Sequence, residues 1–330
     1  ELDRYLRALK KGAVEIESFV RHEHLKWDST LKGHLRYKRE ASYNPQRVRS
    51  ALYRPFCKQW LYFDRMLINS VHLQHYFFPT PNTEAENRVI CISDIAYRAA
   101  QPSALMTNCI ADLHLCASVD GHQCFPFYTY AEDGTDRREN LTDWALEQFQ
   151  AHYADPSIGK WAIFHYIYAA LHSPAYRGRF AAALKKALPR IPFAADFWAY
   201  ARAGAQLADL HVNYEQATPY PLREIETGQS SLPLADRYRV TDKLQLTREG
   251  TAVQVNGGLR LEGIPAATFD YKLGNRSALE WVLDQYQAKA GRDPNQADDP
   301  EYIVRLVRQV VTVSVETVRI EADLPPLFED

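Results

Sequence analysis

The feature that most constrains the fold is an apolar stretch near the middle of the chain, KWAIFHYIYAALH, residues 160–172. The helix that it predicts carries apolar side chains on nearly all of its sides. A helix of that kind is buried rather than laid on a surface. Ser173-Pro174 follows directly, and a proline suits the first turn of a new helix. We therefore expect one central helix, covered by other elements, and a second helix starting at Pro174.

Helical spacing of apolar residues recurs on both sides of this centre. Thr142 is a plausible N-cap for the helix after it, and the segment from Asn275 to Ser277 supplies a cap for a later one. The predicted helices cover residues 2–20, 142–154, 194–215, 277–288 and 300–320. The polar and basic segment 22–40 shows no sustained period, and we assign no element to it.

Strand-like patterns dominate the chain before residue 140 and return once after it. Pro55 separates the first two strands, and Asn256-Gly257-Gly258 is a tight-turn signal in the late alternating region. The predicted strands lie in residues 47–53, 58–64, 88–93, 123–130 and 240–273.

These patterns predict an α+β fold with a strand-rich N-terminal part, a helical middle, and a small late β-meander with closing helices. We divide the chain into residues 1–140, basic and strand-rich, and residues 141–330, helical with the β-meander. One continuous domain is the alternative.

Charge is distributed unevenly along the chain. The whole sequence holds 39 Lys and Arg against 41 Asp and Glu, a net charge of −2, but residues 1–65 hold 15 against 8. A basic head on an acidic body is expected where one face meets a polyanion, although proteins that bind none also show it.

Several function classes are disfavoured by what the sequence lacks. It has no run of 18 apolar residues, so we expect no membrane span. Its five cysteines form no C-x-x-C pair, so we expect reduced thiols in a cytosolic protein and no metal site. His22-Glu23-His24 has the wrong spacing for a metalloprotease helix. No P-loop, dinucleotide fingerprint or nucleophile elbow is present, and we expect no catalytic residues in this chain.

Residues 49–65, RSALYRPFCKQWLYFDR, combine aromatic and cationic side chains at high density. One interpretation is structural, with aromatic rings buried and cationic stems laid along them. A second is that the cations contact phosphates and base edges of a duplex. A third is a stacking platform for single strands.

Several idiosyncratic stretches resemble the C-terminal specificity region of type ISP restriction–modification enzymes. They occur in the family's order and cover roughly residues 27–324. The stretches include YRPFCKQWLYFD (53–64), SALMTNCIADLHL (103–115), IFHYIYAALHSPAYRGRF (163–180), GIPAATFDYKLGNRSALEWVLDQYQ (263–287) and VVTVSVETVRI (310–320).

The resemblance implies a target-recognition domain that reads a short asymmetric duplex sequence for adenine-N6 methylation and restriction. Its partners would be double-stranded DNA and the methyltransferase domain of the same polypeptide. The parent would be an ATP-dependent endonuclease and DNA adenine methyltransferase in a bacterial or archaeal cytoplasm. S-adenosylmethionine, ATP and Mg would belong to its other domains. A chain that starts at Glu1 without those domains fits a fragment.

Within this frame we assign Tyr53, Phe56, Leu61 and Phe63 to the core. The segment before the SALMTN run departs from the family's Gly- and Ser-rich turn, and its side chains are further candidates for DNA contact. The predicted DNA-binding residues are Lys32, Arg36, Lys38, Arg39, Arg47, Arg49, Arg54, Lys58, Gln59, Arg98 and Gln101.

Two other functions stay open at this point. The chain could serve a defence adenine methyltransferase that has no nuclease. It could also be a docking module between motor and methyltransferase that does not touch DNA.

Overall fold

The computed structural model describes residues 27–40, 42–68, 72–93, 102–116, 121–228, 233 and 236–328. The helix expected at residues 2–20 lies outside these ranges. The helices are α3 (Ser29–Arg36), α4 (Gln74–Phe77), α5 (Pro81–Glu86), α6 (Asp143–Tyr153), α7 (Lys160–His172), α8 (Pro174–Arg179), α9 (Ala181–Leu184), α10 (Phe197–Val212), α11 (Ala278–Gln285) and α12 (Tyr302–Ala322).

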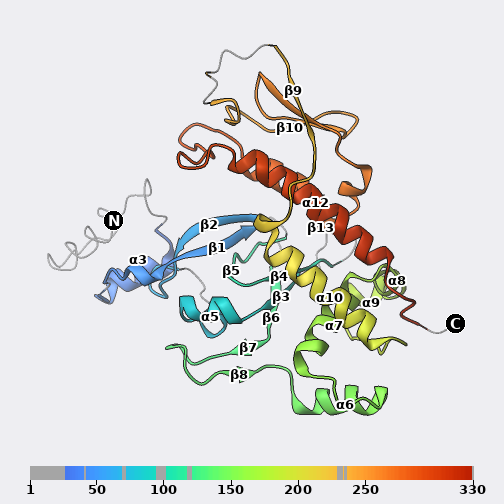
Figure 1. Ribbon diagram of the computed structural model, residues 1–330. Helices are drawn as coiled ribbons and strands as arrows, with labels where there is room; N and C mark the ends of the chain where they lie inside the picture. The colour runs from blue at the N-terminus through green and yellow to red at the C-terminus, as the bar shows by residue number, and fades with distance from the viewer. Residues whose placement is uncertain are drawn as a thin grey trace.

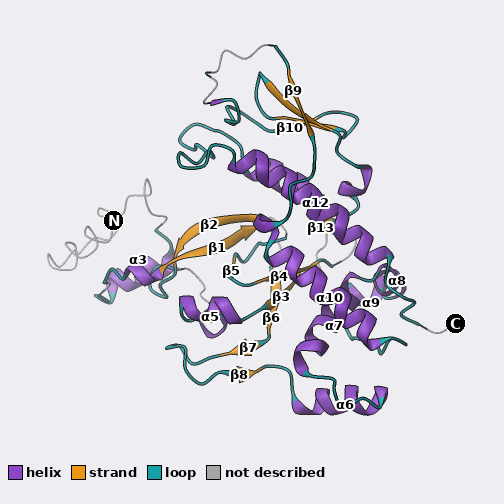
Figure 2. Cartoon of the chain, viewed as in Figure 1, coloured by secondary structure: helices purple, strands orange, loops and turns teal. Residues whose placement is uncertain are grey.

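The strands are short and belong to several small sheets, as an α+β fold requires (Figure 2). They are β1 (Val48–Arg54), β2 (Cys57–Tyr62), β3 (Val89–Ser93), β4 (Ala104–Thr107), β5 (Ile110–Ala111), β6 (His122–Pro126), β7 (Tyr128–Thr129), β8 (Arg138–Glu139), β9 (Arg223–Glu226), β10 (Gln245–Leu246), β11 (Ala252–Gln254), β12 (Leu259–Glu262), β13 (Lys272–Leu273) and β14 (Arg276–Ser277).

An antiparallel sheet of order β4-β3-β6 separates two hydrophobic cores (Figure 1). All five residues of β3 are buried. Val89 and Cys91 belong to one core, whereas Ile90 and Ile92 belong to the other. Successive side chains of a strand point to opposite faces, so both faces of this sheet are covered.

Each core combines segments that are far apart in the sequence. The first contains the β1–β2 hairpin, the late sheet and much of α11 and α12. The second contains α7, α10 and the start of α8, together with Ile320 and Leu327 near the end of the described chain. Both cores therefore include residues from before and after position 140. The division of the chain at that position stays a prediction.

Helix α7 is the buried central helix that the sequence predicts. Tyr166, Tyr168 and Ala169 are fully buried, and α10 packs along α7. Gly204 of α10 makes this close approach possible, because a Cβ there would lie 1.8 Å from the His165 carbonyl oxygen. The contact explains why a glycine interrupts an otherwise alanine-rich helix.

The expected helix starts are confirmed. The hydroxyl of Thr142 accepts a hydrogen bond from the Ala145 N–H, and that of Ser173 caps α8 with Pro174 in its first turn. Ser277 and Glu280 form a capping box at α11. Such caps satisfy backbone N–H groups that have no partner within the helix.

The late β-meander is also confirmed and gains one strand. Strands β10, β11, β12 and β9 form a four-stranded antiparallel sheet in that order. The turn between β11 and β12 includes Asn256-Gly257-Gly258, and the Val255 N–H donates to the Leu259 carbonyl across it at 2.9 Å.

Strands β1 and β2 form a hairpin whose turn contains Pro55 and Phe56. Phe56 adopts a left-handed φ of 58°, which is unfavourable for a bulky residue. Its ring is buried and packs edge-on against Tyr214 at 5.1 Å. Burial of the ring offsets the backbone cost and fixes the hairpin on the first core, so the assignment of Phe56 to the core is confirmed.

Helix α3 was missed by the sequence analysis, which assigned no element to residues 22–40. Trp27, Leu31 and Leu35 recur every fourth residue and are buried, and the Asp28 carboxylate accepts a hydrogen bond from the Leu31 N–H. The helix has only this one narrow apolar stripe, and the many basic residues around it hide the helical period in the sequence. None of the helices within the described ranges is long and apolar enough to cross a membrane.

Candidate nucleic-acid interface

The β1–β2 hairpin has an inner and an outer face. Val48 pairs with Tyr62 and Ser50 with Trp60, and residues that pair across antiparallel strands point to the same side. Trp60 is 81% exposed and Val48 is exposed as well. We call these four residues the outer face; the opposite side carries Arg49, whose side chain is buried in the protein.

The chain between α3 and β1 lies against the outer face. Tyr43 stacks on Tyr62 with ring centroids 5.8 Å apart, and the Asn44 N–H donates to the Tyr62 hydroxyl at 2.9 Å. Tyr43 is itself 65% exposed. Exposed rings on a strand edge form a platform that can meet a partner with little further ordering.

Helix α3 ends beside this platform with a group of basic side chains. Arg36, Lys38 and Arg39 are exposed, and Lys32 is half-buried. Lys38 has a left-handed φ of 55°, which turns the chain away from the helix. The end of α3 therefore presents the exposed part of the predicted DNA-binding set.

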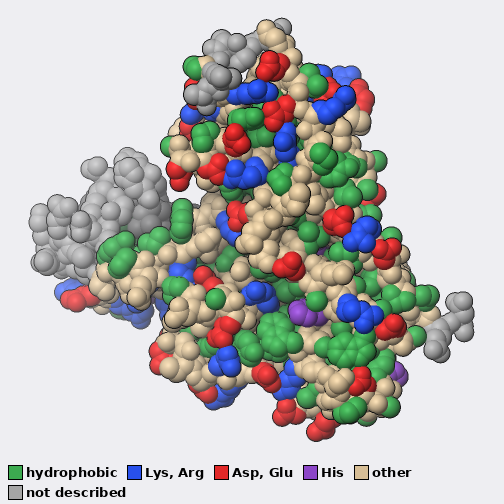
Figure 3. All heavy atoms as spheres, viewed as in Figure 1, with side chains coloured by type: hydrophobic (Ala, Val, Ile, Leu, Met, Phe, Trp, Pro, Cys, Tyr) green, Lys and Arg blue, Asp and Glu red, His purple; other side chains and the backbone are tan. Residues whose placement is uncertain are grey.

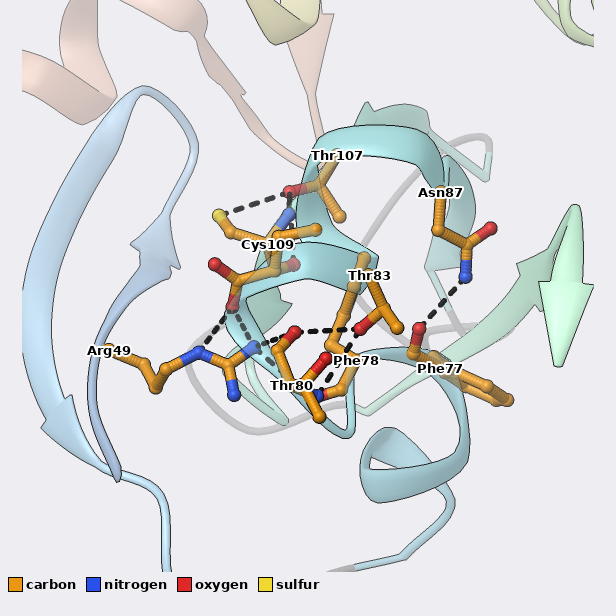
Figure 4. A network of polar contacts seen from close by, with 9 residues as sticks. Arg49, Phe77, Phe78, Thr80, Thr83, Asn87, Thr107 and Cys109 are labelled. Carbon is orange, nitrogen blue, oxygen red and sulfur yellow. Dashed lines mark hydrogen bonds and ion pairs between the residues drawn. The ribbon is translucent and has the colours of Figure 1, made fainter. Parts of the chain in front are cut away.

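Arg49, in contrast, is buried and fully engaged within the protein (Figure 4). Its guanidinium donates to the Glu84 carboxylate and to the carbonyls of Phe78, at 3.2 Å, and Thr80, at 3.0 Å. Burial raises the pKa of Glu84, and the charge of Arg49 opposes that shift. This geometry favours a structural role for Arg49, which ties β1 to the start of α5.

Three further cations, one just before the aromatic stretch and two within it, form ion pairs that attach the hairpin to neighbouring loops. Arg47 pairs with Asp64, and Arg54 donates to Asp112 at 2.7 Å. Lys58 lies 2.6 Å from Glu215. Half-exposed ion pairs contribute little stability. Each acid nevertheless reduces the positive electrostatic potential that its paired cation would present to a phosphate group.

Two of these cations also lie on aromatic rings. Arg54 is 4.1 Å from the centroid of Tyr53, and Lys58 is 5.0 Å from that of Tyr214. The structural interpretation of residues 49–65 therefore fits these contacts, while Trp60 and Gln59 remain exposed for other use.

Gln59 and Trp60 line a cavity of about 740 Å³ between edge strand β2 and the loop before α12. Arg292 and Gln296 of that loop also line it and are exposed. Arginine suits guanine and glutamine suits adenine in base recognition. Glu215, Asp293 and Asp298 make the cavity mixed in charge. The sequence analysis missed the loop, although its polar run RDPNQADD was visible.

The surface cations of the late sheet are largely compensated by acids. Arg237 lies within 2.9 Å of Glu224, and Arg260 pairs with Glu262. Blue and red side chains accordingly intermingle over this sheet (Figure 3). The late sheet is a weaker candidate for a phosphate-binding surface than the end of α3. Arg98 and Gln101 lie outside the residues that the structure describes.

Comparisons with known proteins agree with the resemblance found in the sequence. A family model for the type ISP C-terminal specificity domain matches residues 4–311. No match was found among curated proteins.

Three solved structures are similar over the chain. The cryo-EM structure of a DrdV–DNA complex is 35% identical with a TM-score of 0.84 and covers 99% of this chain. A nuclease-deletion mutant of the type ISP enzyme LlaGI, in complex with a DNA substrate mimic, is 28% identical with a TM-score of 0.81. The ATP-dependent type ISP enzyme LlaBIII bound to DNA is 25% identical with a TM-score of 0.83.

The LlaGI and LlaBIII structures each cover 100% of this chain. In the other direction, this chain spans 33% of the DrdV chain, 30% of the LlaGI chain and 21% of the LlaBIII chain. The matched portion of each relative is thus a third of its length or less. A family model matched over most of the chain, and similar structures over nearly all of it, place the sequence in one family. The chain belongs to the type ISP C-terminal specificity domain family.

Proposed function

We propose that this chain recognises a short asymmetric sequence in double-stranded DNA on behalf of a type ISP restriction–modification enzyme. The observation that carries the proposal is the similarity of nearly the whole chain to three structures that contain DNA or a DNA mimic. A domain devoted to specificity would provide phosphate contacts for register and a few side chains for base edges.

The exposed basic end of α3 suits the phosphate contacts. Arg36, Lys38 and Arg39 project from one short segment. Because the three side chains are exposed, a phosphate group can reach them, although Arg39 also contacts His34 Nδ1 at 3.1 Å. Gln59 and Trp60, at the rim of the mixed cavity, suit contacts that depend on the base.

The activity of the whole enzyme belongs to parts outside the matched region. We propose that the parent protein methylates adenine at N6 and cleaves DNA with ATP hydrolysis, as an ATP-dependent type ISP enzyme would. S-adenosylmethionine, ATP and Mg would then bind to those other domains, and the methyltransferase domain would be this chain's neighbour within the polypeptide. An extruded adenine needs a partner that grips the duplex beside it.

The test is duplex binding measured by fluorescence anisotropy at low and near-physiological salt. The double variant Lys38→Glu/Arg39→Glu should weaken binding on all sequences. If each side chain contacts one phosphate, the salt slope should fall by about 1.8.

Arg223→Glu/Arg319→Glu is the matched control, since it makes the same charge change at exposed positions on β9 and α12. Equal losses in both variants would mean that only net charge matters. Unchanged binding in the α3 variant would remove the end of α3 from the interface.

A further inference from the structure

Strand pairing brings together three possible metal ligands, Cys91 from β3 and the neighbouring His122 and Cys124 from β6. Cys91 of β3 pairs directly with Cys124 of β6, and the two Sγ atoms are 3.8 Å apart. His122 lies two residues before Cys124, so both side chains leave the same face of β6. One donor atom from each of the three residues lies within 4.8 Å of the others.

The spacing of the sulfur atoms fits a tetrahedral metal ion. Zinc binds thiolate sulfur at about 2.3 Å, and a tetrahedral angle then separates two such sulfurs by about 3.8 Å. The observed separation equals that value. A disulfide would instead require the sulfurs to be about 2.05 Å apart.

His122 has the orientation of a histidine ligand. Its Nδ1 lies 3.0 Å from the Leu113 carbonyl oxygen, which selects the tautomer with a proton on Nδ1. Nε2 is buried and has no hydrogen-bond partner in the structure. A backbone carbonyl on one nitrogen and a metal on the other is the usual arrangement of zinc-bound histidines.

Polar groups surround the Cys124 sulfur. The Gln74 amide donates a hydrogen bond to it at 3.4 Å, and the Cys91 sulfur lies 3.8 Å away. A metal ion would supply the charge needed to ionise the two thiols, and their protons would be released to solvent.

One side of the cluster opens to a cavity. His122 and Cys124 line a space of about 520 Å³, together with Gln74 and Asp112. A fourth ligand, such as water, can therefore reach a metal held by the three side chains.

We propose that Cys91, Cys124 and His122 form a binding site for one zinc ion, which clips β3 to β6. The sequence analysis expected no metal site because the five cysteines form no C-x-x-C pair. Cys91 and Cys124 are 33 residues apart and meet only through the strand register. The clip would reinforce the sheet on which both cores rest.

The experiment is replacement of bound metal by cobalt in the purified protein under reducing conditions. One equivalent of Co²⁺ should give the intense visible absorption of a tetrahedral site and the ultraviolet band of cobalt–thiolate bonds. Addition of Zn²⁺ should abolish both. Cys124→Ser and His122→Asn should lose the spectrum or weaken metal binding at least tenfold.

Cys57→Ser is the matched control, because Cys57 is more deeply buried than Cys124 but lies on β2, outside the cluster. It should keep the spectrum. The unaltered protein should also unfold at higher urea concentration with zinc than with a chelator, and Cys124→Ser should lose that difference. The absence of a tetrahedral cobalt spectrum in the unaltered protein, with all five cysteines reduced, would overturn the proposal whatever the variants do.

Discussion

The sharpest prediction concerns Arg49, the cation of the aromatic stretch that the fold buries most deeply. Its side chain is 4% exposed and its partner Glu84 is 20% exposed. Replacement by methionine keeps most of the volume but removes the charge. The Glu84 carboxylate and the carbonyls of Phe78 and Thr80 would then lose their donor.

The expected loss of stability is large. Removing one partner of a buried ion pair costs about 3–5 kcal/mol. The partial exposure of Glu84 places Arg49→Met near the lower end of that range. The double variant Arg49→Met/Glu84→Gln should lose less than the single variant, because no unpaired charge remains.

Equilibrium urea unfolding measures these differences. Arg319→Met is the control, since this exposed arginine pairs with Glu316 and Asp323 on the surface of α12 and should change stability by no more than about 1 kcal/mol. The reasoning would be refuted if Arg49→Met unfolded like the unaltered protein yet bound DNA more weakly, because Arg49 would then serve the interface.

Three other predictions follow from the same structure. Gly204→Ala should lower the free energy of unfolding by about 1–3 kcal/mol or prevent folding, since its Cβ would meet the His165 carbonyl. Thermal unfolding measures this loss, and Gly178→Ala is the control because the space around Gly178 is open. Burial, and to a smaller extent the nearby His172, hold the pKa of His211 well below 6.5. As the pH drops below about 6.5, His211 is therefore protonated in the unfolded chain before it is protonated in the folded protein, and the free energy of unfolding should fall. Urea unfolding at several pH values should show a smaller decline for His211→Gln. Trp60→Ala should change stability by less than about 0.5 kcal/mol but weaken duplex binding by about 1 kcal/mol or more. If anisotropy gave the same affinity for the variant as for the unaltered protein, the outer face would not belong to the interface.

Much of the helical fold was predictable because its signals are local. The apolar stretch of α7, the proline of α8 and the capping box of α11 each act within a few residues of the chain. Helix α3 was missed because three buried residues at intervals of four are a weak signal among cations.

The side-chain roles were harder to predict because they depend on long-range pairing. Arg47 and Arg49 look equivalent in RVRSALY, yet Arg49 points inward to Glu84 while Arg47 stays near the surface. Cys91 and Cys124 likewise meet only through the register of β3 and β6. No local pattern encodes either outcome.

In the function proposed above, this chain determines which DNA sequence the enzyme modifies. The most direct measurement replaces the matching C-terminal region of a type ISP enzyme, such as the one in the DrdV–DNA complex, with this chain, and then maps methylated adenines by sequencing. We expect methylation at a new short asymmetric sequence, with the original sequence left unmodified. Methylation that stays at the original sequence would contradict the proposed role of the chain.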